Sequence, residues 1–382
     1  MKPLRLLFIL DNYWPHVGGA ERAFKALCEG MAARGHAVTV LTQHYDCAPG
    51  REELSGVRIV RVASSNRYAF TFAGMAPALE LAREADLIHA ATFNAAPVGS
   101  LAGLIARRPT VLTVFETWIG RWQSYSDFAP WKAALHDLAE RAIFAFPYDR
   151  YVGISESTSA RLRQVVPRAR GRDATIYFDF DPAPWQKDAG RAARNAIAPP
   201  DAFLIVGFGR PGTSKGFGYL IDAFPRIRAQ LPNAALALVL SESPQYARAL
   251  RDLKARASEG ITFLPPLDFP DLVGLVRAAD CVVVPSVTEG FGYTTLEACA
   301  AGVPVVACDT TSIPEVIGGR HILVAPRDSD AIARAVVDVS RGLTNETPLR
   351  AFPLSATLDR YEALYEQLLL SGRGGSSRPA NA

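Results

Sequence analysis

The sequence has little of what builds a disulfide-stabilised, metal-binding or membrane-spanning protein. It contains five cysteines, an odd number without a CxxC pair, and six histidines that form no metal-binding pattern. These counts argue against a disulfide framework and favour a reducing compartment. No apolar run approaches the ~20 residues that span a bilayer, and the net charge of +3 gives no reason to expect nucleic acid as a partner. We therefore expect a cytoplasmic protein that is soluble, or at most peripheral at the inner face of the membrane.

The chain of 382 residues is too long for one ordinary core. Short apolar runs alternate with amphipathic helical patterns from one end to the other, which is typical of parallel sheets covered by helices on both faces. The expected strands are residues 4–10, 37–42, 57–62, 87–90, 110–115 and 150–154 in the first half, and 203–207, 234–240, 261–264, 281–284, 303–307 and 322–324 in the second.

The alternation breaks at residues 180–201, which are rich in proline, alanine and arginine. A domain boundary is expected there, giving an N-terminal domain over 1–182 and a C-terminal domain over 183–352. A helix over 353–370 would cross back to the first domain. The polar tail 371–382 has nothing to bury, and we expect it to be disordered.

The strongest local signal is the segment EGFGYTTLE at 289–297, which follows an apolar run. It predicts that a strand ends, that a glycine loop follows, and that a helix begins near Gly292 and ends at about Ala301. Backbone N–H groups at a helix start attract anions. Gly290 and Gly292 would let the backbone approach a phosphate closely.

The carboxylates of Glu289 and Glu297 are suited to accept hydrogen bonds from adjacent hydroxyl groups of a sugar or a ribose. A loop acid and a solvated helix acid would explain the two residues equally well if they stood alone. The position of Glu289 at the carboxyl end of a strand favours the functional interpretation, because ligands of open α/β sheets bind there.

A second signal is the glycine-rich segment VGFGRPGTSKG at 206–216, between an expected strand and an expected helix. Arg210 and Lys215 could clamp a diphosphate from one side, while the backbone amides from Phe291 to Tyr293 hold the other. The spacing of glycine and lysine does not match a P-loop. A basic pair on a surface turn is the alternative.

A third signal is Gly18-Gly19, which follows the first expected strand and opens the helix at Ala20. At the carboxyl edge of the first sheet, these glycines would position the phosphates or the sugar of a ligand. A tight turn with a helix cap is the plain alternative.

The three motifs, their order and their spacing resemble the retaining glycosyltransferases of family four, from residue 4 to about residue 370. The most specific element is the E-x7-E motif from Glu289 to Glu297. The resemblance implies the GT-B fold, an α/β architecture in which two Rossmann-like, doubly wound parallel-sheet domains face a deep cleft. It also implies transfer of a hexose-type sugar from a nucleoside diphosphate to a hydroxyl acceptor, with retained configuration, without a metal and without a further cofactor.

The resemblance assigns the acceptor to the N-terminal domain and the donor mainly to the C-terminal domain. Arg210 and Lys215 would contact the diphosphate, Glu289 the sugar hydroxyls and Glu297 the ribose. The expected donor-binding residues are Gly18, Gly19, Arg210, Lys215, Glu289, Gly290, Phe291, Gly292, Tyr293 and Glu297.

The chain departs from the family pattern after the strand expected at 110–115. Members often carry a histidine there, near the transferred sugar, whereas this chain has Phe115 followed by Glu116. Glu116 is a candidate replacement for that polar group, or it shapes the acceptor pocket only. The candidate catalytic residues are therefore Glu289, Glu116, Arg210 and Lys215.

Other residues are candidates for a place beside the ligands. His89 ends an expected strand and is a candidate to line the cleft. Aromatic residues concentrate in first-domain loops on the expected acceptor side, where exposed ones would suit a sugar ring or a lipid-linked acceptor at a membrane surface. They are Trp14, Trp118, Trp122, Tyr125 and Trp131. Two other functions stay open, namely a nucleotide-sugar-binding protein without transferase activity and a nucleotide-sugar epimerase.

Overall fold

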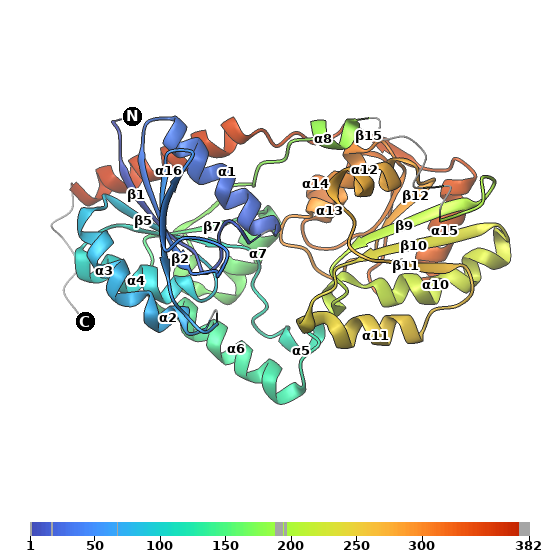
Figure 1. Ribbon diagram of the computed structural model, residues 1–382, viewed down its shortest axis with the longest axis horizontal. Coiled ribbons are helices and arrows are strands. Elements are labelled where there is room, and N and C mark those ends of the chain that lie inside the picture. The colour runs from blue at the N-terminus through green and yellow to red at the C-terminus, as the bar shows by residue number, and fades with distance from the viewer. Residues whose placement is uncertain (1, 17, 67, 188–193, 195–196, 374–382) are drawn as a thin grey trace. The chain divides into compact units, whose positions relative to one another are not determined.

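The computed structural model describes residues 2–16, 18–66, 68–187, 194 and 197–373. The chain folds as two compact units, each with its own sheet (Figure 1). The first unit comprises Met1–Ile119, His136–Asp179 and Phe352–Ala382, and the second comprises Gly120–Leu135 and Phe180–Ala351.

The first unit is built on an eight-stranded sheet with the order β3-β4-β2-β1-β5-β6-β7-β8. Neighbouring strands are parallel, except that β3 and β4 form an antiparallel pair at the edge. The strands are β1 (Arg5–Ile9), β2 (Ala37–Gln43), β3 (Arg51–Leu54), β4 (Val57–Val62), β5 (Leu87–Ala91), β6 (Thr110–Val114), β7 (Arg150–Gly153) and β8 (Asp173–Thr175).

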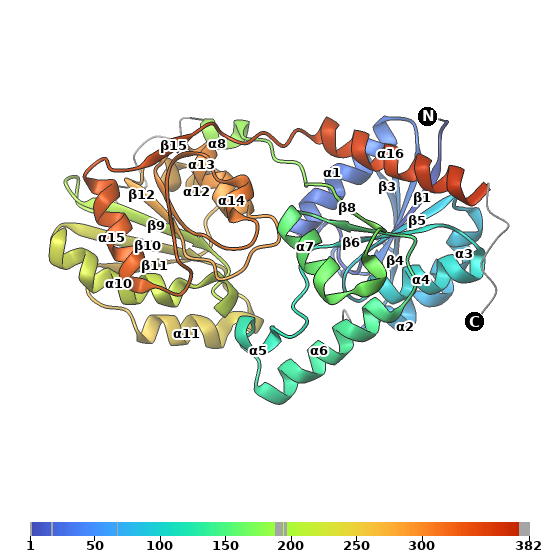
Figure 2. The same ribbon diagram turned by 180° about the vertical axis from the view of Figure 1, so that it is seen from behind.

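Helices cover both faces of this sheet, as the continuous apolar strands predict. Figures 1 and 2 show α1 (Gly19–Ala33) and α16 (Leu354–Arg373) on one face, and α3 (Met75–Glu84) and α4 (Ala95–Ala106) on the other. The core beneath α3 and α4 includes the buried side chains of Ile88 and Leu112. The remaining helices of the first unit are α2 (Phe70–Ala73), α7 (Glu156–Val165), η1 (Pro167–Ala169) and the part of α6 (Pro130–Ala145) that follows Leu135.

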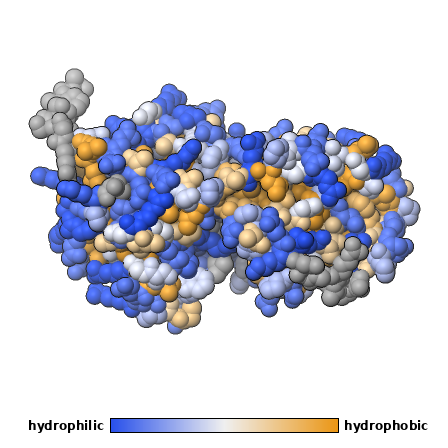
Figure 3. Space-filling model, turned by 90° about the horizontal axis from the view of Figure 1, so that it is seen from above, coloured by the Kyte–Doolittle hydropathy of each residue, from blue (hydrophilic) through white to orange (hydrophobic). Residues whose placement is uncertain are grey.

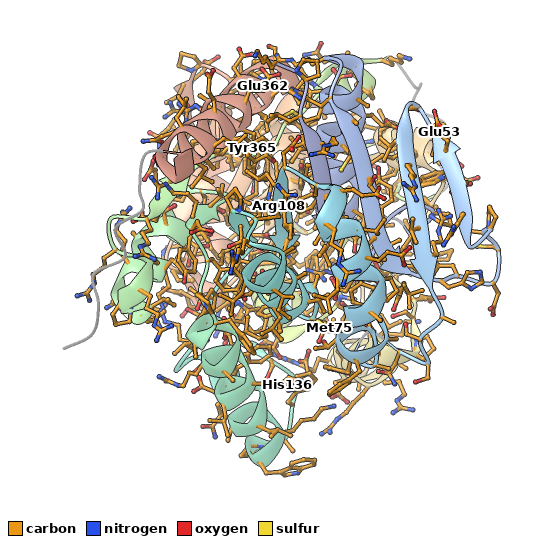
Figure 4. All side chains as sticks on the ribbon, turned by 90° about the vertical axis from the view of Figure 1, so that its left-hand side faces the viewer. Glu53, Met75, Arg108, His136, Glu362 and Tyr365 are labelled. Atoms are coloured by element: carbon orange, nitrogen blue, oxygen red, sulfur yellow. The ribbon has the colours of Figure 1, made fainter. Side chains whose placement is uncertain are left out.

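The C-terminal helix α16 belongs to the first unit, where it packs against α1. Glu362 on α16 (Figure 4) accepts one hydrogen bond from Arg34 at 2.6 Å, and its other carboxylate oxygen lies 2.9 Å from Nε2 of His36. The helix continues to Arg373, three residues into the tail expected at 371–382. The hydroxyl of Ser371 donates to the carbonyl of Gln367 and extends the last turn. Residues 374–382 lie outside the described residues.

The second unit is built on a seven-stranded sheet with the order β11-β10-β9-β12-β13-β14-β15. Only the pair β14 and β15, at the edge, is antiparallel. The strands are β9 (Phe203–Gly209), β10 (Ala234–Leu240), β11 (Ile261–Leu264), β12 (Cys281–Val284), β13 (Val305–Cys308), β14 (Gly319–Val324) and β15 (Asn345–Thr347).

Helices also cover both faces of the second sheet, and α10 and α15 pack against each other on one of them (Figure 1). The helices are α5 (Trp122–Tyr125), α8 (Ala183–Gln186), α10 (Phe217–Gln230), α11 (Ala247–Ala255), α12 (Phe269–Arg277), α13 (Tyr293–Ala300), α14 (Ile313–Val316) and α15 (Ser329–Ser340), with η2 (Thr213–Lys215) and η3 (Pro244–Tyr246).

The two units do not follow one simple division of the sequence. Residues Gly120–Leu135 belong to the second unit, whereas the sequence analysis placed them in a continuous first domain. Contacts far apart in the sequence explain the difference, because the Asp127 carboxylate accepts from the backbone N–H of Thr213 at 3.1 Å. Arg327 likewise donates to the carbonyl of Ser124 at 2.9 Å.

Polar residues cover much of the molecular surface. In the view of Figure 3, hydrophilic residues are interspersed with patches of hydrophobic ones. In the described part of the chain, no helix is both long enough and apolar enough to cross a membrane.

Candidate functional site

The second unit brings two of the predicted motifs together at one edge of its sheet. Strands β9 and β12 are parallel neighbours at the middle of the sheet, and the strand order reverses between them. The loop with Arg210 and Lys215 follows β9, and the loop with Glu289 follows β12. Both loops therefore lie at the carboxyl ends of the strands, at the point where open α/β sheets bind ligands.

Backbone contacts lock the two loops against each other. The carbonyl of Ser214 accepts hydrogen bonds from the N–H groups of Val287 at 2.8 Å and Thr288 at 3.3 Å. Gly216 has a φ of 68°, and a Cβ there would collide with the carbonyl of Pro285. Glycine is required at this position for both its backbone conformation and its close approach to the neighbouring loop.

Lys215 and Glu289 are in direct contact. The Nζ of Lys215 donates to Oε1 of Glu289 at 2.6 Å, and the side chains are only 17% and 8% exposed. The hydroxyl of Ser286 donates to the same Oε1 at 2.8 Å. A cation and a carboxylate thus share a largely buried position, where their interaction is stronger than at an exposed surface.

The backbone of Glu289 is held from the opposite side by the segment between β13 and α14. Its N–H donates to Oγ1 of Thr311 at 2.8 Å, and its carbonyl accepts from the hydroxyl of Ser312 at 3.1 Å. The hydroxyl of Thr310 donates to the carbonyl of Val287 at 3.0 Å. Three consecutive hydroxyl residues therefore fix the loop after β12.

The helix predicted to begin near Gly292 and end at about Ala301 is α13, Tyr293–Ala300. Gly292 precedes it with a φ of 99°, and no side chain caps the helix start. The buried Oγ1 of Thr295, in the first turn, has no hydrogen-bond partner among the described residues. An uncapped helix start beside a buried, unsatisfied hydroxyl is suited to bind an anion.

The other predicted residues of this unit lie on the same elements. Gly290 and Phe291 are buried in the loop, and the ring of Phe291 packs edge-on against Tyr293 at 4.9 Å. Glu297 is buried on α13. Arg210 is exposed after β9, where its guanidinium lies 3.4 Å from the hydroxyl of Tyr246.

In the first unit, Gly18 and Gly19 lie at the start of α1, after β1, as predicted. Gly18 is the N-cap residue in extended conformation. A Cβ at Gly18 would collide with the carboxylate of Glu21, which lies 3.4 Å from Nδ1 of His16. This helix start therefore carries an anion of its own.

Phe115 and Glu116 follow β6, again at the carboxyl edge of the first sheet. The ring of Phe115 packs against Phe24 at 5.9 Å and against Phe178 at 6.1 Å. Its carbonyl accepts from the hydroxyl of Thr158 at 3.3 Å. Phe115 thus belongs to an aromatic cluster, and Glu116, the next residue, is half-buried.

His89 belongs to the core of the first unit, so its expected position lining a cleft is wrong. The imidazole is fully buried, with Nδ1 2.6 Å from the hydroxyl of Tyr365 and Nε2 2.7 Å from Oγ1 of Thr113. Tyr361 lies 3.0 Å from the same Thr113 oxygen. Burial lowers the pKa of His89 to about 3, which keeps the ring neutral at ordinary pH.

Sequence reasoning missed the hydroxyl groups that organise the site. Ser286 stands three residues before Glu289, and this spacing within one loop is a signal that was available. Thr295 and Thr311 give no comparable signal, because their roles depend on the fold. Within the described ranges, no three His, Cys, Asp or Glu side chains gather into a possible metal site.

Comparison with known proteins places this geometry in a family. A model described as Glycosyltransferase Family 4 matches residues 17–177, and one described as Glycosyl transferases group 1 matches residues 201–341. An uncharacterized glycosyltransferase of Methanocaldococcus jannaschii is 30% identical over 356 residues, covering 87% of this chain and 88% of that protein. The chain belongs to glycosyltransferase family four.

This glycosyltransferase has further relatives of known name. It is 27% identical over 365 residues to the glycogen synthase of Mycobacterium tuberculosis, covering 88% of this chain and 86% of that enzyme. The crystal structure of Anabaena HepE in complex with UDP and glucose matches with a TM-score of 0.72 at 20% identity, covering 95% of this chain and 100% of that chain. The predicted GT-B fold class is confirmed.

Proposed function

We propose that this glycosyltransferase is a retaining enzyme that moves a hexose-type sugar from a nucleoside-diphosphate sugar to a hydroxyl group of a glycan, a lipid-linked molecule or a small molecule, without a metal ion. The observation that carries the proposal is the contact between Lys215 and Glu289 beside the uncapped start of α13. A cation and helix amides suit a diphosphate, and an adjacent carboxylate suits the hydroxyls of the attached sugar.

The two oxygens of the Glu289 carboxylate have different surroundings. Both Lys215 and Ser286 donate to Oε1, and no described residue donates to Oε2. We propose that Oε2 accepts a hydrogen bond from a hydroxyl of the donor sugar. Glu297 would accept from the ribose.

In the proposed reaction, the bond between the anomeric carbon and the diphosphate oxygen breaks, and the acceptor oxygen bonds to that carbon on the same face. The acceptor hydroxyl passes its proton to the departing diphosphate. Arg210, Lys215 and the start of α13 stabilise the negative charge that develops on the leaving group. Arg210 and Lys215 supply the compensating positive charge, so the proposed reaction needs no metal ion.

We propose acceptor binding for the first unit and donor binding for the second. Glu116, at the carboxyl edge of the first sheet, is proposed to support the positive charge on the sugar ring or to shape the acceptor pocket. Gly18 and Gly19 remain proposed donor contacts. The carboxylate of Glu21 at the start of α1 favours contact with sugar hydroxyls over contact with phosphate, because it repels a second anion.

A donor screen tests the proposal. UDP-glucose, GDP-mannose and ADP-glucose would each be added in a thermal-shift assay, and release of the free nucleoside diphosphate would then be measured with and without candidate acceptors. A ligand at 100 times its Kd stabilises by about 2.7 kcal/mol. Because the similar Anabaena HepE structure is a complex with UDP and glucose, UDP-glucose is the first donor to test. Binding without sugar release would favour a binding protein, and conversion to another nucleotide sugar would favour an epimerase.

We also propose a cytoplasmic location with peripheral membrane contact, and the exposed face of α6 supports the membrane contact. Trp131, Leu135 and Leu138 follow the helical spacing and are 71%, 56% and 65% exposed. Such a face suits the lipid interface.

Co-sedimentation with phosphatidylglycerol vesicles should fall in Leu135→Gln and Leu138→Gln, while Leu104→Gln on α4 serves as the control for an exposed leucine elsewhere. Equal sedimentation of all variants would contradict the contact.

A further inference from the structure

We propose that Thr311 is a positioning residue that holds Glu289 in place for the donor sugar, an inference that rests on the proposed function. Thr311 lies between β13 and α14, outside every motif that the sequence analysis singled out. Its Oγ1 accepts the hydrogen bond of the Glu289 N–H at 2.8 Å. Thr311 does not need to touch the donor, because it acts through the backbone of the residue that does.

The backbone of Thr311 is unusual for its residue type. Its φ is 44°, in the left-handed region that β-branched residues rarely adopt. Glycine would occupy this conformation without strain. Retention of a strained backbone at a site is a pointer to function. What threonine supplies here, and glycine cannot, is the hydroxyl that meets the Glu289 amide.

The contact matters because Glu289 is fixed at three points. Thr311 and Ser312 hold its N–H and its carbonyl, while Lys215 and Ser286 hold Oε1. Loss of the Thr311 hydroxyl frees the backbone on one side and changes the direction in which Oε2 points. The sugar contact should suffer, whereas the phosphate contacts at Lys215 and α13 should remain.

Three variants separate this role from a purely structural one. Thr311→Gly removes the hydroxyl and relieves the strained φ, whereas Thr311→Ser keeps the hydroxyl. Ser55→Gly is the control, because it relieves a similar φ of 50° in the hairpin between β3 and β4, far along the chain from the site. We expect Thr311→Gly to melt at or above the wild-type temperature and to lose roughly 10- to 100-fold in kcat, as small misplacements of reacting groups do. Thr311→Ser and Ser55→Gly should retain wild-type kcat.

Binding and exchange measurements complete the test. The Kd for UDP, GDP or ADP, whichever wild-type binds, should stay within about twofold in Thr311→Gly, because an interaction with the sugar alone is lost. Hydrogen exchange of the Glu289 amide, followed in peptides covering 286–292, should be faster in Thr311→Gly than in Ser55→Gly.

The outcomes distinguish failure of the inference from failure of the proposed function. Wild-type exchange protection of the Glu289 amide in Thr311→Gly would overturn the inference whether or not the protein is a transferase. Wild-type kcat in Thr311→Gly would overturn it in an active enzyme. A wild-type protein that releases nucleoside diphosphate from none of UDP-glucose, GDP-mannose and ADP-glucose would count against the proposed function, while the exchange measurement would still decide the contact.

Discussion

Replacing Lys215 by methionine should lower both the stability of the second unit and its affinity for nucleoside diphosphate. The Nζ of Lys215 lies 2.6 Å from Oε1 of Glu289, and both side chains are largely buried. A hydrogen bond to a charged group contributes about 1.5–3 kcal/mol. Lys215→Met leaves the buried carboxylate with Ser286 as its remaining side-chain partner, so we expect a loss of about 2 kcal/mol, or about 4–8 °C in melting temperature.

A double-mutant cycle isolates the pair. Glu289→Gln alone should cost less, about 1 kcal/mol, because the amide oxygen still accepts from the lysine. The variant Lys215→Met/Glu289→Gln should be at least about 1 kcal/mol more stable than the sum of the single effects predicts. Calorimetric melting gives the unfolding free energy of the wild type, the two single variants and the double variant. Additive effects, or a Lys215→Met melting temperature within 1 °C of wild type (roughly the size of a neutral surface change), would refute the buried pair.

Three further predictions address the remaining assignments. The unfolding free energy should fall by about 2 kcal/mol from pH 6.5 to pH 5 because of His89, and His89→Gln should flatten this slope in chemical denaturation. Because the pKa of His89 is near 3 in the folded protein, the unfolded chain takes up the proton first as the pH falls. The stability that the neutral, buried ring contributes is therefore present above pH 6.5 and is lost as the pH falls towards 3. Transfer activity should survive EDTA, and a rate restored only by Mn²⁺ or Mg²⁺ would contradict the metal-free proposal. Glu116→Gln should lower kcat with nucleotide affinity intact, whereas a raised acceptor KM alone would assign Glu116 to the acceptor pocket.

Strands with continuous or nearly continuous apolar sequences could be predicted closely. The strands expected at 234–240, 261–264 and 281–284 have those same bounds in the structure. The edge strands β3, β8 and β15 were missed, because their residues REEL, DAT and NET show no apolar pattern and are exposed or only partly buried. These strands form because they hydrogen-bond to a neighbouring strand, and a local sequence pattern does not show which segments pair.

The loops that carry the candidate residues could be placed from the sequence, but the contacts between those residues could not. Lys215 was expected at the diphosphate and Glu289 at the sugar, and nothing in the sequence indicated that they touch. His89 looked like a strand-end ligand, yet Tyr365, its hydrogen-bond partner, and Tyr361, whose ring packs against it, both stand more than 270 residues away. Such pairings depend on α16 returning to the first unit from the end of the chain, and local sequence patterns do not reveal which residues it meets there.

The docking of α16 has a consequence for the order in which the protein can be made. A ribosome synthesises residues 1–180 long before residues 354–373, so the nascent first unit has the ring of His89 and the hydroxyl of Thr113 without their tyrosine partners. The second unit, whose own residues end at Ala351, is complete before the first. The half of the enzyme that is translated first is therefore the half that finishes folding last.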